Sequence, residues 1–193
     1  NDPADAMSLS NDRVTLVYED SVGVLWVGTA GGGLNRMEWP GGDAPARFTR
    51  YQNVPGVTQT LSSDVVFTLY EDTSGALWVG TADGLNLFQR DTETFAHYGE
   101  RDGLPNALVA CIREDAQGNL WLSTGRGLAR FDPRVGSFRT YDQNDGLQSN
   151  QFHQGSCTGG PQGRLYFGGA NGFNAFDPAQ ITDNLTPPAI VLT

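Results

Sequence analysis

The sequence has few positive charges and no long apolar run, and each shortage excludes a class of protein. It carries 12 Lys and Arg against 22 Asp and Glu, for a formal net charge of -10. Nucleic-acid binding needs cations that displace phosphate counterions, so this balance argues against nucleic acids and equally against anionic polymers as partners. No stretch of about eighteen apolar residues is present, so we expect no transmembrane helix in the chain.

Cysteines and targeting signals are also scarce. The two cysteines, Cys111 and Cys157, are too few for a disulfide framework. In the repeat alignment below, Cys157 corresponds to Glu114, which places the two thiols at different heights in neighbouring units. We therefore expect buried free thiols, with a disulfide as the alternative. No signal peptide is visible, and the polar, turn-like start at Asn1 leads us to interpret the chain as an excised fragment.

What the sequence does contain is an internal repeat. The tract at 61–81 recurs at 9–29 and at 104–124, and a degenerate copy starts at Leu147. The second, third and fourth copies start 43 residues apart, whereas the first interval is 52 because turn-rich segments hold insertions. A period near 43 residues is the size of one β-propeller blade.

Each copy divides into four strand-like pieces. In the second copy they cover 65–70, 77–81, 85–88 and 95–98, separated by turns rich in Gly and Asp. No stretch shows a convincing helical period. The predicted fold class is therefore all-β: a propeller with four consecutive four-stranded antiparallel blades, at about 9–60, 61–103, 104–146 and 147–186.

The last copy departs from this pattern. The first three copies carry a Phe-x-x-Tyr motif on the fourth strand, but none follows Phe176. We expect the fourth blade to lack its own outer strand and the chain to be a fragment of a larger propeller. Because uncovered blade faces and unpaired strand edges are sticky, we also expect self-association.

Positions that agree between copies are interpreted as structural. Large aromatic side chains, expected to fill the wedge between adjacent blades, are Trp26, Trp78, Trp121 and Tyr166. Aspartates expected to bond the backbone two residues on, in the first hairpin turn, are Asp20, Asp72 and Asp115. Their spacing lacks the dense ligands of a calcium loop. Turn glycines expected to need left-handed backbone geometry are Gly33, Gly84, Gly127 and Gly172.

The repeated motif Asp-x-x-Gly-x-Leu-Trp-Val-Gly-Thr-x-x-Gly-Leu-Asn resembles the repeat of the two-component regulator propeller family. The inter-blade stretches 102–104 and 145–147 fit that family as well, and the resemblance runs from about Ser8 onward. The final tract, 187–193, resembles the entry into the Ig-like domain that follows such propellers.

The resemblance implies the extracytoplasmic, periplasmic sensor region of a bacterial inner-membrane receptor. In that family an Ig-like domain, a transmembrane helix and a cytoplasmic output module follow, often a histidine kinase or a diguanylate cyclase. The chain would then contact the membrane only through its parent receptor. It would sense a ligand without being an enzyme and without a cofactor.

Ligand contacts are expected where the copies differ, because loops on a repeated scaffold carry recognition. The candidates are polar residues of variable loops and of the divergent first strand of the last copy: Asp83, Arg126, Asn171, Asn150 and His153. His153 is expected to face the central channel, and His97 to occupy an exposed, tolerant position. The favoured ligand is a neutral glycan or another small extracytoplasmic molecule.

Two other functions stay open. The blades could form a protein–protein interaction or dimerisation scaffold, which would use the same loops. The less favoured alternative is a propeller lyase resembling the streptogramin-inactivating type. That chemistry needs an acid–base pair near the channel, and His97 and His153 lie on different strands.

Overall fold

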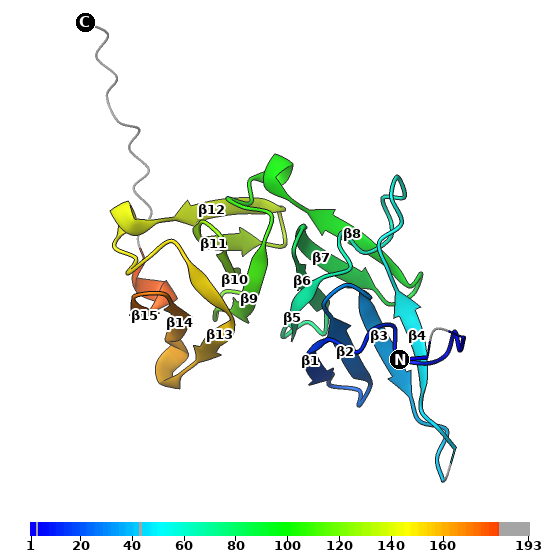
Figure 1. Ribbon diagram of the computed structural model, residues 1–193. Helices are drawn as coiled ribbons and strands as arrows, with labels where there is room; N and C mark the ends of the chain where they lie inside the picture. The colour runs from blue at the N-terminus through cyan, green and yellow to red at the C-terminus, as the bar shows by residue number, and fades with distance from the viewer. Residues whose placement is uncertain (3, 43, 182–193) are drawn as a thin grey trace, which may run out of the picture.

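The computed structural model describes residues 1–2, 4–42 and 44–181, which form four antiparallel sheets (Figure 1). Blade one contains β1 (Val14–Glu19), β2 (Leu25–Thr29), β3 (Leu34–Glu38) and β4 (Arg47–Tyr51). Blade two contains β5 (Val66–Glu71), β6 (Leu77–Thr81), β7 (Gly84–Gln89) and β8 (Thr94–Tyr98). Blade three contains β9 (Val109–Glu114), β10 (Leu120–Thr124), β11 (Gly127–Asp132) and β12 (Ser137–Tyr141). Blade four contains β13 (Phe152–Gly159), β14 (Leu165–Gly169) and β15 (Gly172–Phe176).

The predicted all-β propeller architecture is confirmed. Strand order within each sheet follows sequence order, as successive hairpins require. The sheet of blade four has three strands among the described residues, so the expected lack of an outer strand is also confirmed. The tract 187–193, assigned above to the entry of a following domain, lies outside the described residues.

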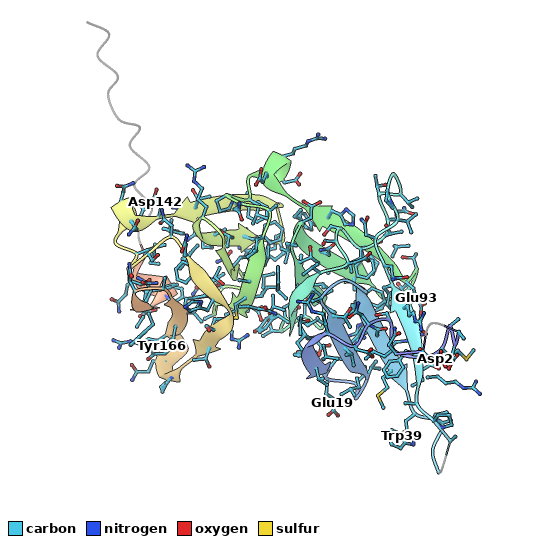
Figure 2. All side chains as sticks on the ribbon, viewed as in Figure 1. Asp2, Glu19, Trp39, Glu93, Asp142 and Tyr166 are labelled. Carbon is cyan, nitrogen blue, oxygen red and sulfur yellow. A yellow bond between two sulfur atoms is a disulfide. The ribbon has the colours of Figure 1, made fainter. Side chains whose placement is uncertain are left out.

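The blades lie side by side in chain order, and their first strands face a common centre (Figure 1). The outer strands β4, β8 and β12 lie at the periphery. Blade one carries an extended β3–β4 hairpin whose tip presents Trp39, which is 66% exposed (Figure 2). None of the helices within the described residues has the length and apolar character needed to cross a membrane.

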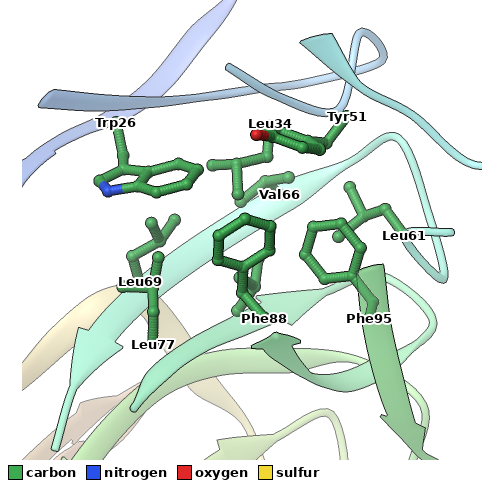
Figure 3. Close-up of a cluster of buried hydrophobic side chains, with 10 residues drawn as sticks. Trp26, Leu34, Tyr51, Leu61, Val66, Leu69, Leu77, Phe88 and Phe95 are labelled. Carbon is green, nitrogen blue, oxygen red and sulfur yellow. The ribbon is translucent and has the colours of Figure 1, made fainter. Parts of the chain in front are cut away.

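Tryptophans fill the wedges between adjacent blades. The Trp26 ring lies 5.1 Å from that of Phe88 in blade two, and Figure 3 shows it facing the side chains of that blade. The same contact recurs one blade further on, between Trp78 and Phe131 at 5.6 Å. It recurs again between Trp121 and Phe176 at 4.8 Å. Each blade is therefore held to the next by an edge-to-face or tilted aromatic pair in a buried cluster.

Tyr166 occupies the matching place in blade four, and there the pattern stops. It lies at the outer side of that blade in Figure 2. Its ring contacts Phe173 of its own blade, at 6.4 Å, instead of an aromatic ring of a following blade. The Tyr166 ring is consequently only half-buried, whereas the three tryptophans are fully buried.

The hairpin aspartates have a second task beyond the turn. One carboxylate oxygen of Asp115 accepts from the backbone N–H groups of Gln117 and Asn119, as an Asx turn requires. The other oxygen accepts from the indole Nε1 of Trp121 at 2.8 Å. Equivalent indole bonds join Trp26 to Asp20 and Trp78 to Asp72. The aspartate thus orients the side chain that packs against the next blade.

The predicted left-handed turn glycines have positive φ angles, at +92° for Gly127 and +109° for Gly172. They differ in their surroundings. A Cβ on Gly127 would lie 2.2 Å from the carbonyl oxygen of Tyr141, on the outer strand of its blade. A Cβ on Gly172 would meet nothing within 4 Å among the described residues, because blade four has no outer strand there.

The first strand of blade four is longer than its counterparts. In blade three, Val109 pairs with Thr124 and Ile112 pairs with Leu122. In blade four, Phe152 pairs with Gly169 and Cys157 pairs with Phe167, with an irregularity between them. This bulge adds two residues to β13 relative to β9.

The bulge changes the assignment of the cysteines. Cys157 is structurally equivalent to Ile112 of blade three. It therefore lies beside Cys111 at nearly the same height, with their Cα atoms 6.1 Å apart, and the two form a disulfide. The repeat alignment, which allowed no insertion before Cys157, had made it equivalent to Glu114. The expectation of free thiols was wrong because the position of the insertion was misjudged. Leu147 and Leu165 lie 18 positions apart, against 16 for Leu104 and Leu120, but the sequence does not say on which side of Cys157 the extra residues fall.

Candidate ligand-binding cavity

A cavity of about 820 Å³ lies where the first strands of the four blades face one another. Its lining comes from 14–18 of β1, 67–70 of β5, two residues of β9 and two of β13. Strands of four different blades thus meet at one place, which no single repeat could form. Propellers present their innermost strands to the central channel, so this is the natural position for a small ligand.

The bulge of β13 supplies one wall of the cavity. Gly155 has a φ of +67°, and the chain turns there so that Gln154 and Gly155 enter the lining. The side-chain amide of Gln154 donates a hydrogen bond of 3.3 Å to the carbonyl oxygen of Phe67 in blade two. The disulfide between Cys111 and Cys157 ties the same bulge to β9. This wall is consequently anchored at both ends.

Arg113 of β9 supplies the charge of the cavity. Its guanidinium donates to the carbonyl oxygens of Ile112 at 2.7 Å and Cys157 at 2.8 Å. It also lies 5.8 Å from the centroid of the Tyr70 ring, within cation–π distance. Burial lowers the pKa of the Arg113 guanidinium, but an arginine remains protonated throughout the physiological range.

Tyrosines form the aromatic part of the lining. The Tyr18 hydroxyl accepts a hydrogen bond of 3.1 Å from the backbone N–H of Glu71, so its ring is fixed between blades one and two. Tyr70 occupies the equivalent place in blade two, and burial raises the pKa of its hydroxyl. The Tyr70 phenol is therefore neutral near pH 7. Tyrosine rings beside amide and guanidinium donors can both stack on a ligand and orient it.

The loop residues predicted as ligand contacts lie away from this lining. Asp83, Arg126 and Asn171 are exposed in the turns between second and third strands, and none of them lines the cavity. Asn150 serves the framework, because its backbone oxygen accepts from Gly127 and its side-chain oxygen from Gln143. Their role in ligand binding stays a prediction.

The two histidines occupy separate blades. His153 is exposed on β13 and is not among the lining residues, although its neighbour Gln154 is. His97 is half-buried, and its Nε2 contacts the carbonyl oxygen of Thr60, so the expectation of an exposed position was wrong. The described part of the chain holds no group of three or more His, Cys, Asp or Glu that could bind a metal ion.

Arg113 and Gln154 are not among the candidate residues predicted from the sequence. A signal for Arg113 was present, because it stands where Tyr18 and Tyr70 stand in the preceding copies. A departure from the repeat on the innermost strand indicates a position with a role beyond the scaffold. Gln154 gave no such signal, since its place depends on the bulge of β13.

Three segments of the chain match the family model described as two component regulator propeller, at residues 8–31, 60–83 and 103–126. They contain the inter-blade segment and the first two strands of blades one to three. No matched segment falls in blade four, whose place in the propeller rests on the degenerate repeat copy and on its sheet of β13, β14 and β15. No curated protein matches the chain.

Solved structures share the fold. One is described as the extracellular domain of the hybrid two-component system BT3049 from B. thetaiotaomicron, with 28% identity and a TM-score of 0.78. The match covers 92% of this chain and 23% of that one. PorZ, a surface component of the type-IX secretion system of Porphyromonas gingivalis, matches with 20% identity and a TM-score of 0.66 over 85% of this chain and 26% of its own. Virginiamycin B lyase from Staphylococcus aureus matches with 15% identity and a TM-score of 0.59, over 91% of this chain and 59% of the lyase.

Proposed function

Because this chain carries the repeats of the two-component regulator propeller family, we propose that it is an extracytoplasmic ligand-sensing module of a signal-transduction receptor. Its likeness to the extracellular domain of BT3049, at 28% identity over nearly the whole chain, supports this proposal. The chain spans only 23% of that extracellular domain, so the sensing role is proposed for it as one part of a longer receptor.

The disulfide supports a location outside the cytoplasm. Cytoplasmic reductants keep most thiols reduced, whereas disulfides persist in the periplasm and at the cell surface. Cys111 and Cys157 are both buried and form their bond within the wall of the cavity. We place the module in the periplasm, attached to the inner membrane through its parent receptor.

The cavity between the innermost strands is the observation that carries the sensing function. Its volume of about 820 Å³ lies within the usual range of small-molecule sites. The rings of Tyr18 and Tyr70 can stack on a sugar, and Gln154 can exchange its bond to Phe67 for bonds to hydroxyl groups. A glycan of a few sugar units is the ligand class favoured here.

Thermal melts of the purified chain test this function. We expect at least one oligosaccharide of a panel to raise the melting temperature at millimolar concentration. The variant Gln154→Ala should lose most of that increase, whereas Gln162→Ala, at an exposed position outside the cavity, should keep it. Failure of every sugar to change the melting temperature would remove the sensing function from this cavity.

We assign the module no catalytic activity of its own. The described residues that line the cavity include no His, Asp, Glu or Lys, the side chains that most often act as general acid or base. The likeness to virginiamycin B lyase is one of fold, at 15% identity.

A second function, a dimerisation scaffold, is favoured by the uncovered blade faces at the two ends of the arc. Val17 on β1 is 61% exposed and Phe173 on β15 is 66% exposed, although their repeat equivalents are buried. Val17 also lines the cavity, so a second copy that covers this face would lie at the edge of the ligand site.

A further inference from the structure

The cavity is positive although the molecule is strongly acidic. The chain has a net charge of -10, yet no Asp or Glu is among the residues lining the cavity. The charge of the lining belongs to Arg113. The overall charge is therefore a poor guide to the ligand, because recognition depends on the groups that face it.

Arg113 has no carboxylate partner within the described structure. Its polar contacts are the carbonyl oxygens of Ile112 and Cys157, and its guanidinium lies over the ring of Tyr70. The acidic neighbour, Glu114, points to blade two, where it accepts from the backbone and the hydroxyl of Thr73. Carbonyl dipoles and an aromatic face orient a guanidinium but leave its full charge uncompensated, which is uncommon for a half-buried arginine.

The two carbonyl bonds leave part of the guanidinium free to bind a ligand. An arginine carries further N–H donors in a planar fork, and such a fork matches an oxyanion with two parallel hydrogen bonds. The bonds to Ile112 and Cys157 fix the plane of the fork, so little side-chain freedom would be lost on binding. Gln154 lines the same cavity and offers an amide beside it.

We propose that Arg113 binds an oxyanion group, a carboxylate or a sulfate, of a small sugar-sized ligand in this cavity. The inference rests on the proposed sensing function and narrows its ligand from a neutral glycan to an acidic one. Arg113 anchors the charged group, and the rings of Tyr18 and Tyr70 contact the body of the ligand. The acidic exterior does not interfere, because charges on the surface are screened over about 8–10 Å at physiological salt.

Three probes that differ mainly in charge test the inference. The ¹⁵N-labelled chain is titrated with glucuronate, with glucose 6-sulfate and with glucose, and the Nε–H signal of Arg113 is followed by NMR. We expect millimolar glucuronate or glucose 6-sulfate, or both, to shift this signal, and glucose to leave it unchanged. The apparent affinity for the acidic probe should fall as salt is added. Which acidic probe binds more tightly distinguishes a carboxylate from a sulfate.

Variants locate the effect. Arg113→Gln should weaken binding of the acidic probe at least tenfold, and Arg113→Lys should weaken it less because the charge remains while the fork is lost. Arg101→Gln, at an exposed position outside the cavity, should bind as the wild type does. If the Arg113 variants do not fold, the wild-type titrations alone still decide the matter.

The outcomes separate this inference from the function on which it rests. If glucose shifts the side-chain signal of Gln154 as strongly as the acidic probes do, and the Arg113 signal stays in place, sensing stands and the oxyanion inference is overturned. If no probe of either charge shifts any signal of the cavity, both are overturned.

Discussion

The aspartate of the first hairpin turn connects local structure to packing between blades. Each of Asp20, Asp72 and Asp115 uses one oxygen for the turn and the other for the indole of the tryptophan six residues later. A buried indole N–H without a partner costs free energy, so the carboxylate allows the ring to lie fully inside the wedge. In blade four, Gly160 and Tyr166 replace the pair, and the ring lies so close to the glycine that a Cβ on Gly160 would be 2.4 Å from it.

Asp115→Ala should lower the free energy of unfolding by about 3 kcal/mol, because the turn loses its acceptor and Trp121 loses its partner. Chemical denaturation monitored by circular dichroism measures the change. Asp91→Ala, in an exposed turn of blade two, is the matched control and should cost less than about 0.5 kcal/mol. Equal losses in the two variants would refute the dual role of Asp115.

Asp20 should make stability depend on acid. Burial alone would raise the pKa of Asp20, but hydrogen bonds from Trp26, Val24 and Arg90 outweigh it and hold that pKa below its ordinary value. A carboxyl with a lowered folded-state pKa stabilises the protein above its unfolded pKa, and this contribution is lost as pH falls through the folded value. The stability difference between wild type and Asp20→Asn should therefore be largest near pH 7 and shrink below about pH 4.

Denaturation curves at several pH values check this prediction. Asp91→Asn, at an exposed position in a turn of blade two, serves as the control. A wild-type advantage over Asp20→Asn that stays constant down to pH 2–3 would contradict the assignment.

At the scale of elements, the turn between the second and third strands of a blade forms hydrogen bonds with the segment that leads into the following blade. The backbone N–H of Gly84 donates to Ala107 at 2.6 Å, and that of Gly127 donates to Asn150 at 2.8 Å. In blade one the same place is taken by Gly31 and Gly33, which both donate to Asp64. These hydrogen bonds fix the position of each blade relative to its neighbour. Side-chain packing alone would allow the blades to slide past one another.

The two turn glycines of blades three and four form a natural comparison. Gly127→Ala should destabilise by more than about 3 kcal/mol, because an unfavourable φ is joined by a clash with the Tyr141 carbonyl. Gly172→Ala has the same unfavourable φ and open space, so about 1–2 kcal/mol is expected. Thermal and chemical denaturation measure both. A loss at Gly172 as large as that at Gly127 would show that φ, and not the neighbouring outer strand, sets the cost.

The disulfide joins the first strands of blades three and four across 46 positions of the chain. By the chain-entropy model, closing a loop of that length stabilises the folded state by about 4 kcal/mol. We expect reductant to raise the mass of the denatured chain by about two daltons and to lower its melting temperature. The double variant Cys111→Ala with Cys157→Ala should be less stable and should no longer respond to reductant. An unchanged mass in reductant would show that the thiols are free.

At the scale of the whole molecule, the arc ends in two faces that other blades cover elsewhere. Val14 and Val17 are 46% and 61% exposed, whereas Val66 and Leu69 at the same places in blade two are 0% and 6% exposed. At the other end, Phe173 is 66% exposed and its equivalent Leu85 is fully buried. We propose that a second copy covers these faces. The exposed face of blade one is equivalent to the face of blade two that packs against blade one. The exposed face of blade four is equivalent to the face of blade three that packs against blade four, so the two kinds of face fit each other.

Light scattering of the purified chain should give a mass of twice 20.8 kDa at micromolar concentrations. Val17→Asp or Phe173→Asp should shift the mass toward that of a single chain, because burying an unpaired carboxylate in such a contact is costly. Val135→Asp is the control, since Val135 is 73% exposed in a turn away from both faces. A wild-type mass of 20.8 kDa, or equal effects of all three variants, would rule out this mode of association.

The sequence alone determined the fold, because the information for it is local and repeated. Four copies of one hairpin pattern, with an aromatic residue in register in all four and an aspartate in the first three, indicate successive blades arranged around a centre. The roles of Asp115 and Gly127 in turns followed from the conformations that each residue type favours. The absent outer strand of blade four followed from the missing motif after Phe176.

The candidate site was decided only by tertiary structure. A cavity between four first strands has no counterpart within one repeat, so Arg113 and Gln154 gained their importance from neighbours distant in sequence. The bulge of β13 shifts Cys157 by two positions relative to the repeat. This shift brings Cys157 beside Cys111, so the two cysteines form a disulfide where free thiols were expected. The sequence shows the extra length of this copy but not the place of the bulge, since that place depends on which backbone groups pair across the sheet, and the pairing is settled when the blades pack together.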